Sequence, residues 1–260
     1  MAKPALRIER DGPIGWMIFD NPARRNAINE DMWRAIPPAM ADFDADLEVR
    51  CVVLRGAGSV AFAAGADISE FEKRRANENS AGEHDNIIDA AQLALEDSAK
   101  PVLAMIQGYC LGGGVEIALA CDLRYAGASS SFAIPAARLG IGYGVHGTNR
   151  LVASVGHAAA REIMLTGRRY SADEALAMGL VNRLLPDAEL EAYVREIASM
   201  LAANAPLSMA ASKAIINGVI EASGDFSKGQ ELIARCARSE DHVEGRRAFM
   251  EKRAPKFKGK

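Results

Sequence analysis

The stretch IQGYCLGGGVEIALACD, residues 106–122, places a carboxylate, Glu116, inside an apolar run directly after three consecutive glycines. The preceding segment, KPVLAMIQG at 100–108, has the composition of a buried strand, and VEIALACD has enough apolar content for a short buried helix. A strand, a glycine turn and a helix in succession favour an α/β architecture with buried strands.

Glycines between a strand and a helix have a chemical use. Without Cβ atoms, residues such as Gly112 and Gly113 let a ligand approach peptide N–H groups closely, and the start of a helix adds unpaired N–H groups. A carbonyl oxygen that gains negative charge would be stabilised there. Glu116 follows one turn later among apolar neighbours, and loss of hydration suits a carboxylate to proton transfer. The alternative is that Glu116 only favours the helix dipole, and the spacing leaves both readings open.

A second glycine turn occurs upstream in VAFAAGADISEF, residues 60–71. Asp67 with Glu70 three residues later fits a capping box, which favours a helix N-cap over a catalytic acid. The N–H group of Ala66, just after Gly65, is a candidate second donor. Two N–H donors and one carboxylate in an apolar site suit chemistry on a carbonyl compound through an enolate.

The rest of the chain alternates predicted strands and helices. Apolar and polar residues alternate on both sides of Asp11-Gly12, which predicts a β-hairpin. Helical spacing at 25–46 contains Pro37-Pro38, a pair expected to bend or interrupt the helix. Further elements are predicted as strands at 49–58, 123–127 and 130–135, and a helix at about 84–96. From about Pro206 onward the sequence predicts helices only.

The composition is that of an ordinary globular protein. The chain has 260 residues, 49% of them hydrophobic and 25% charged, with a net charge of -3. That charge balance does not indicate a basic surface that would bind nucleic acid or an anionic membrane, so neither partner is expected. The start lacks a signal-peptide core, which predicts a cytoplasmic protein.

The cysteines and histidines do not form a metal-binding pattern. Cys51, Cys110, Cys121 and Cys236 are widely separated and form no CxxC pair, so free thiols are expected. The four histidines are scattered and show no HExxH spacing. We therefore expect no metal site.

Six motifs in order resemble the enoyl-CoA hydratase/isomerase, or crotonase, superfamily over nearly the whole chain. They are NPARRNAIN, FAAGADI, KPVLAMIQGYCLGGGVEIALACDLRYA, FAIPAARLGI, LTGRRYSADEALAMGLVNRLLP and AFMEKRAPKF. The resemblance implies an α/β fold built as a spiral of ββα units at 1–200, with a helical trimerisation region at 201–260. It also implies a homotrimer or a dimer of trimers.

In that family the substrate is an acyl-CoA thioester, and no separate cofactor is implied. The resemblance assigns the thioester oxygen to the N–H groups of Ala66 and Gly113, and the adenine to the carbonyl of Ala64. Phe249 and Lys252 would complete the nucleotide site, often from a neighbouring subunit. The substrate-binding residues implied are Arg24, Ala27, Ala64, Gly65, Asp67, Ile68, Gly112, Ala136, Phe249 and Lys252.

Glu116 matches one of the two catalytic glutamates of typical hydratases. The second follows the proline of FAIPAARLG, where this chain has Ala136. Three hypotheses follow. The leading one is hydration of a 2-enoyl-CoA to a 3-hydroxyacyl-CoA, the second is Δ3-Δ2 isomerisation with Glu116 as the sole base, and the third is an acyl-CoA-binding pseudoenzyme.

Two residues of the segment RLGIGYGVHGTNRL are candidate auxiliary groups. Tyr143 is interpreted as a lining residue of the acyl pocket rather than as a proton donor. His146 could act as an acid or base near neutral pH, but such loop histidines are more often solvated or hydrogen-bonded.

Overall fold

The computed structural model describes residues 4–67, 80–221 and 225–260, with backbone only for 80–85. Ile68 and Glu70, both singled out in the sequence, lie outside these ranges.

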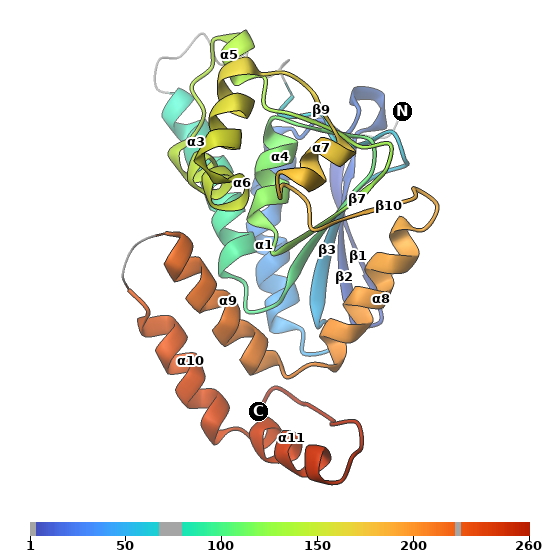
Figure 1. The fold of residues 1–260 in the computed structure, drawn as a ribbon, viewed down its shortest axis with the longest axis vertical. Helices are drawn as coiled ribbons and strands as arrows, with labels where there is room; N and C mark the ends of the chain where they lie inside the picture. The colour runs from blue at the N-terminus through green and yellow to red at the C-terminus, as the bar shows by residue number, and fades with distance from the viewer. Residues whose placement is uncertain (1–3, 68–79, 222–224) are drawn as a thin grey trace.

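Two sheets form the centre of the molecule (Figure 1). The larger has the order β1-β2-β3-β5-β7-β10 and the smaller the order β4-β6-β8-β9. The strands of the larger sheet are β1 (Ala5–Asp11), β2 (Ile14–Asp20), β3 (Cys51–Gly56), β5 (Val102–Ile106), β7 (Leu123–Gly127) and β10 (Arg183–Leu185). Those of the smaller are β4 (Ala61–Ala63), β6 (Tyr109–Leu111), β8 (Ser131–Ala133) and β9 (Tyr170–Ser171).

The predicted hairpin is confirmed. β1 and β2 pair antiparallel with Asp11 opposite Ile14, so that Gly12, at φ 56°, and Pro13 make the turn. The other pairings within the larger sheet are parallel.

A repeated path explains why the chain makes two sheets. β5 enters the larger sheet, β6 enters the smaller one, and α4 (Gly113–Ala120) follows. The next repeat runs through β7, β8 and α5 (Ala136–Leu139), and β3 with β4 make the corresponding earlier pair. This succession is the predicted spiral of ββα units.

The remaining helices enclose the sheets and form the C-terminal region. They are α1 (Glu30–Ala45), α3 (Ser80–Asp97), α6 (Val145–Thr166), α7 (Ala172–Ala177), α8 (Leu190–Ala203), α9 (Pro206–Ile220), α10 (Ser227–Arg238) and α11 (Glu240–Met250). A 3-10 turn, η1, occupies Pro22–Arg24. No helix in the described part of the chain is both long and apolar enough to span a bilayer.

Alternation along β2 produces a core on each side of the larger sheet. Trp16 and Ile18 pack with Leu190 and Val194 of α8, whereas Met17 belongs to the larger core that contains α1 and α4. Figure 1 shows α8 on one face of the sheet and α1 on the other. Successive side chains of a strand point to opposite faces, so both faces of β2 must be apolar.

Helix α1 runs unbroken through Pro37-Pro38, so the expected interruption does not occur. Ile36, Ala39 and Met40 are buried on either side of the proline pair. Burial of this apolar face compensates for the hydrogen bonds that the prolines cannot donate.

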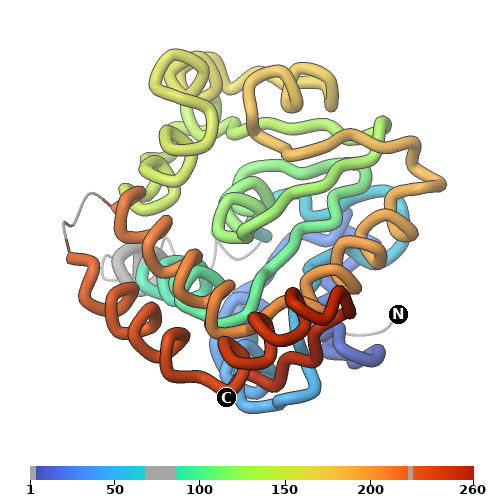
Figure 2. Tube along the Cα trace, turned by 60° about the horizontal axis from the view of Figure 1, so that its bottom comes forward, coloured from blue at the N-terminus to red at the C-terminus, as the bar shows by residue number. Residues whose placement is uncertain are grey.

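Helices α9, α10 and α11 gather at one end of the molecule (Figure 2). Helical structure from Pro206 onward agrees with the sequence, although the expected boundary between 200 and 201 falls inside α8. Apolar side chains on the outside of these helices are exposed, and they include Ile216, Val219, Ile233, Val243, Phe249 and Met250.

Asn26 ties the segment before α1 to the connection between β3 and β4. The Asn26 Nδ2 group donates to the carbonyls of Ala57 at 3.0 Å and Ala61 at 2.7 Å, and Oδ1 accepts from Asn21 N at 3.1 Å. The residue is buried and has a left-handed φ of 56°, a conformation that asparagine tolerates better than most residues.

Replacing Asn26 with Ala should lower the free energy of unfolding by about 2 to 4 kcal/mol, because two carbonyls and one N–H group lose a buried partner. Urea unfolding measures this loss. The exposed Asn86 of α3 offers a control, since Asn86→Ala should change the same free energy by less than about 0.5 kcal/mol. Equal effects of the two variants would contradict the role given to Asn26.

Candidate active site

The three glycines set the start of α4 close to the smaller sheet. Gly112 has φ 49° and ψ -116°, a backbone conformation for which glycine is needed, and its N–H group donates to Ala133 O at 2.8 Å. A Cβ atom at Gly114 would lie 2.4 Å from Ala63 O, so only glycine allows this approach. The first turn of α4 therefore lies directly against the end of β4.

That approach brings the two predicted N–H donors together. A Cβ atom at Gly113 would lie 3.4 Å from Ala66 N, and one at Gly65 would lie 4.0 Å from Gly113 N. Within the described residues, no backbone carbonyl accepts a hydrogen bond from the Ala66 or Gly113 N–H group. The two N–H groups thus lie near each other, and neither is used in a backbone hydrogen bond of the described residues.

The chain before α1 holds the Ala66 loop in place. Ala64 N donates to Arg25 O at 3.0 Å, and Ile28 exchanges backbone bonds with Gly65 O at 2.8 Å and Asp67 N at 2.9 Å. These bonds attach the 64–67 segment to the chain directly before α1.

Arg24 and Asp67 form an ion pair on this loop. The Arg24 guanidinium donates to the two Asp67 carboxylate oxygens at 2.5 and 2.6 Å, and the Arg24 side chain is 52% exposed. Asp67 was expected to cap a helix with Glu70, which lies outside the described residues. The ion pair places Asp67 beside η1, a contact that the local sequence did not indicate, and the predicted helix cap stays a prediction.

Glu116 is buried in α4, all eight residues of which are buried. The Glu116 side chain meets α6 at Gly147, where a Cβ atom would lie 2.9 Å from Glu116 Oε1 and 3.2 Å from Tyr143 Cε1. Glu116 and Tyr143 are therefore neighbours, and Gly147 provides the space in which both side chains fit. The role of glycine here depends on tertiary contact, so the sequence analysis missed it.

Tyr143 has an unusual environment for a phenol. Its hydroxyl oxygen is sealed from solvent and makes no hydrogen bond to the described residues. Burial, reinforced by the neighbouring Glu116 carboxylate and by Cys110, raises the pKa of Tyr143 well above its ordinary value. The phenol keeps its proton at neutral pH.

Ala136 is the first residue of α5 and is buried, with Pro135 at the N-cap. A methyl group at this position can neither accept nor donate a proton.

Among the described residues, no group of three histidine, cysteine or acidic side chains is arranged to hold a metal ion. Cys51, Cys110, Cys121 and Cys236 are free thiols, as expected.

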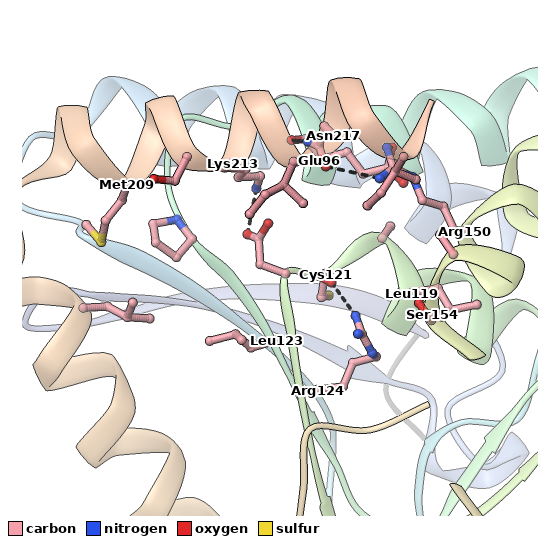
Figure 3. A pocket seen from close by; sticks show the side chains of 18 of the residues that line it. Glu96, Leu119, Cys121, Leu123, Arg124, Arg150, Ser154, Met209, Lys213 and Asn217 are labelled. Atoms are coloured by element: carbon pink, nitrogen blue, oxygen red, sulfur yellow. Dashed lines mark hydrogen bonds and ion pairs between the residues drawn. The ribbon is translucent and has the colours of Figure 1, made fainter. Parts of the chain in front are cut away.

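His146 is engaged away from Glu116, in a buried polar network. His146 Nε2 lies 3.0 Å from both carboxylate oxygens of Glu96, and Glu96 also accepts from Arg150 Nη2 at 2.5 Å. Asn217 of α9 accepts from Arg150 at 3.2 Å and donates to Glu96 O at 2.9 Å. Figure 3 shows Glu96, Arg150 and Asn217 converging from α3, α6 and α9.

A cavity of about 720 Å³ adjoins this network beneath α9 (Figure 3). Leu119 and Cys121, at the C-terminal end of α4, line it together with Lys213, whose Nζ lies 2.8 Å from Asp122 Oδ2. Glu116, Ala66 and Gly113 are not among its lining residues. The cavity is therefore separate from the Ala66 and Gly113 N–H groups, and Gly113 lies at the opposite end of the same helix.

Phe249 and Lys252 lie apart from the other predicted site residues. Phe249 belongs to α11 and is 83% exposed, and Lys252 follows that helix. Figure 1 shows α11 at the far end of the molecule from the first turn of α4. Within one chain these two residues do not join the site.

The pH dependence of stability tests the His146 network. The hydrogen bond that His146 donates to the Glu96 carboxylate raises the pKa of His146 despite burial and the opposing Arg150 charge, and Asp89 adds to the rise. A raised folded-state pKa contributes stability that is present below the unfolded value of about 6.5 and is lost as pH rises through the folded value. His146→Gln should therefore cost about 1 kcal/mol more near pH 6 than near pH 9.

Urea unfolding at the two pH values measures this difference. His157→Gln is the matched control, because His157 is an exposed histidine of α6 and its loss should change the free energy of unfolding by less than about 0.5 kcal/mol. A cost of His146→Gln that did not change with pH would contradict the assignment.

Known proteins resemble this chain in sequence and in fold. Residues 9–260 match the family described as enoyl-CoA hydratase/isomerase. The short-chain-enoyl-CoA hydratase of Clostridium acetobutylicum is 36% identical over 249 residues, which cover 95% of this chain and 94% of that protein. The carnitinyl-CoA dehydratase of Salmonella typhi is 36% identical over 264 residues, which cover 98% and 99%.

A solved structure, an enoyl-CoA hydratase/carnitine racemase from Magnetospirillum magneticum, superposes with a TM-score of 0.93 at 36% identity, covering 100% of this chain and 97% of that one. The chain belongs to the enoyl-CoA hydratase/isomerase family.

Proposed function

We propose that the protein adds water to a 2-enoyl-CoA to give a 3-hydroxyacyl-CoA. The observation that carries the proposal is the convergence of the Ala66 and Gly113 N–H groups next to the end of α4 that bears buried Glu116. The names of the similar hydratase and dehydratase support the same chemistry.

The proposed reaction uses Glu116 for both proton transfers. The thioester oxygen accepts hydrogen bonds from Ala66 N and Gly113 N. The oxygen of a water molecule bonds to C3, its proton passes to the Glu116 carboxylate, and the C2–C3 electron pair moves into an enolate. Glu116 then returns that proton to C2, so that water has been added and Glu116 is regenerated. Each donor of an oxyanion hole typically contributes about 3 to 4 kcal/mol to lowering the barrier.

We propose the remaining substrate contacts from the family resemblance. The Ala64 carbonyl and the segment at 24–27 would meet the CoA, with no cofactor besides CoA itself. Phe249 and Lys252 would reach the nucleotide of a neighbouring subunit, because they lie away from the site of their own chain. Exposed apolar side chains on α9, α10 and α11 support a trimer or hexamer in which residues 201–260 form the contact region.

Δ3-Δ2 isomerisation is the second candidate, and buried Ala136 favours it. Moving a proton between C2 and C4 needs one base and no group to hold water. That requirement matches a site with Glu116 and with the methyl group of Ala136 in place of the second glutamate of typical hydratases. An absorbance assay separates the reactions: hydration removes the conjugated absorbance of crotonyl-CoA, whereas isomerisation of a 3-enoyl-CoA creates it. Tight acyl-CoA binding with neither change would indicate a binding protein without catalysis.

Glu116→Gln should lower kcat for hydration of crotonyl-CoA by about 10³-fold, because an amide cannot carry the proton. Binding of unreactive butyryl-CoA, measured by calorimetry, should change less than about threefold, since the N–H donors remain. Glu189→Gln, at the exposed start of α8, is the charge-matched control and should retain full activity. Retained activity in Glu116→Gln would exclude the assigned role.

Gly147→Ala should lower kcat by about 10- to 100-fold, because the new methyl group lies 2.9 Å from Glu116 Oε1 and must displace the carboxylate. Gly142→Ala provides the control, since a Cβ atom there has no neighbour within 4 Å. Steady-state kinetics and thermal unfolding should be measured for both variants. Normal activity in Gly147→Ala would show that the position of Glu116 is not critical.

A further inference from the structure

The Tyr143 hydroxyl is the polar group near Glu116 that the proposed reaction leaves without a role. It is sealed from solvent and has no hydrogen-bond partner among the described residues. A buried hydroxyl without a partner is unfavourable, and Phe would fill the same space without that penalty. The oxygen atom therefore calls for an explanation other than packing.

Its surroundings indicate what the hydroxyl faces. The Tyr143 ring and the Glu116 carboxylate both contact the position of Gly147, with Cε1 and Oε1 at 3.2 and 2.9 Å from a Cβ atom placed there. The two side chains are thus adjacent, yet the hydroxyl makes no hydrogen bond to the carboxylate. An oxygen atom that belongs to a substrate could contact both groups.

The chemistry of hydration requires a second polar contact at this place. Glu116 accepts one proton from the water that attacks C3, but a single contact does not fix the direction of the oxygen lone pair. Ala136 offers only a methyl group. In dehydration, the departing hydroxyl gains negative charge until its proton arrives, and a neutral O–H donor would stabilise that charge.

We infer that the Tyr143 hydroxyl binds the oxygen atom that is added to C3 in hydration and lost from C3 in dehydration. This inference rests on the proposed function. In dehydration, Glu116 takes the proton from C2, the enolate pair forms the C2–C3 double bond, and the C3–O bond breaks. The leaving oxygen takes the proton back from Glu116 and departs as water, while Tyr143 donates a hydrogen bond to it throughout.

Tyr143 keeps its own proton in this scheme. Burial and the Glu116 charge hold the pKa of the phenol well above its ordinary value, so the group acts as a donor and not as a base. The role is distinct from that of Glu116, which carries protons, and from that of the Ala66 and Gly113 N–H groups, which bind the thioester oxygen.

The test compares a reaction that needs the C3 oxygen with one that does not. Hydration of crotonyl-CoA needs it, whereas exchange of the C2 protons of butyryl-CoA in D₂O needs only Glu116 and the two N–H groups. Tyr143→Phe should lower kcat for hydration at least about tenfold, with KM changed less than about threefold and C2 exchange retained. Glu116→Gln should lose both reactions.

Tyr125→Phe is the matched control, because Tyr125 is a buried tyrosine of β7 that packs against Tyr193 in the other core. It should hydrate at the wild-type rate. Thermal unfolding of Tyr143→Phe should occur at the wild-type temperature or above it, which shows that lost activity does not reflect lost folding.

Two outcomes would overturn the inference about Tyr143 and leave the proposed function standing. Hydration by Tyr143→Phe at the wild-type rate would show that the hydroxyl does not contact the reacting oxygen. A parallel fall of hydration and C2 exchange would show that Tyr143 only positions Glu116. Failure of the wild-type protein to hydrate crotonyl-CoA is a different result, because it would overturn the proposed function itself.

Discussion

The close approach of α4 to the end of β4 is the constraint on which the rest of the site depends. Gly114 permits it, since any side chain there would collide with Ala63 O, and Gly112 supplies the turn into the helix. The approach aligns Gly113 N with Ala66 N and fixes where Glu116, one turn later, can reach. The spiral path serves this contact, because successive units place β4, β6 and β8 side by side in the smaller sheet, with α4 following β6.

Glu96 of α3 and Glu116 of α4 are buried carboxylates in different environments. Glu96 serves the stability of the fold, whereas Glu116 has the proposed role in the reaction. Glu96 is surrounded by cationic and amide groups from α6 and α9, so His146 and Arg150 serve to join helices. Glu116 instead meets Gly147 and the neutral phenol of Tyr143. The cavity beneath α9 adjoins the Glu96 network, since Glu96, Arg150 and Asn217 line it.

Much of the fold could be predicted because its determinants are local. The Asp11-Gly12 turn, the alternation along β2 and the apolar helix after the glycines each act within a few residues of the chain. Pro37-Pro38 shows the limit of local reasoning, because burial around the pair outweighs the helix-breaking tendency of proline. His146 shows the same limit, since its partner Glu96 is fifty residues away.

The sequence by itself determined the family and the candidate donor Gly113 through six motifs that occur in order along the chain. Its glycine turns and apolar patterns determined most strands and helices and singled out Glu116 and Ala66 as candidate site residues, because these signals are local. Only the tertiary structure decided which polar groups share a space. It paired His146 with Glu96, placed Gly147 against Glu116, and left the Tyr143 hydroxyl sealed beside that carboxylate. These relations depend on where α6 meets α3 and α4, and no spacing along the sequence encodes the distance between two helices.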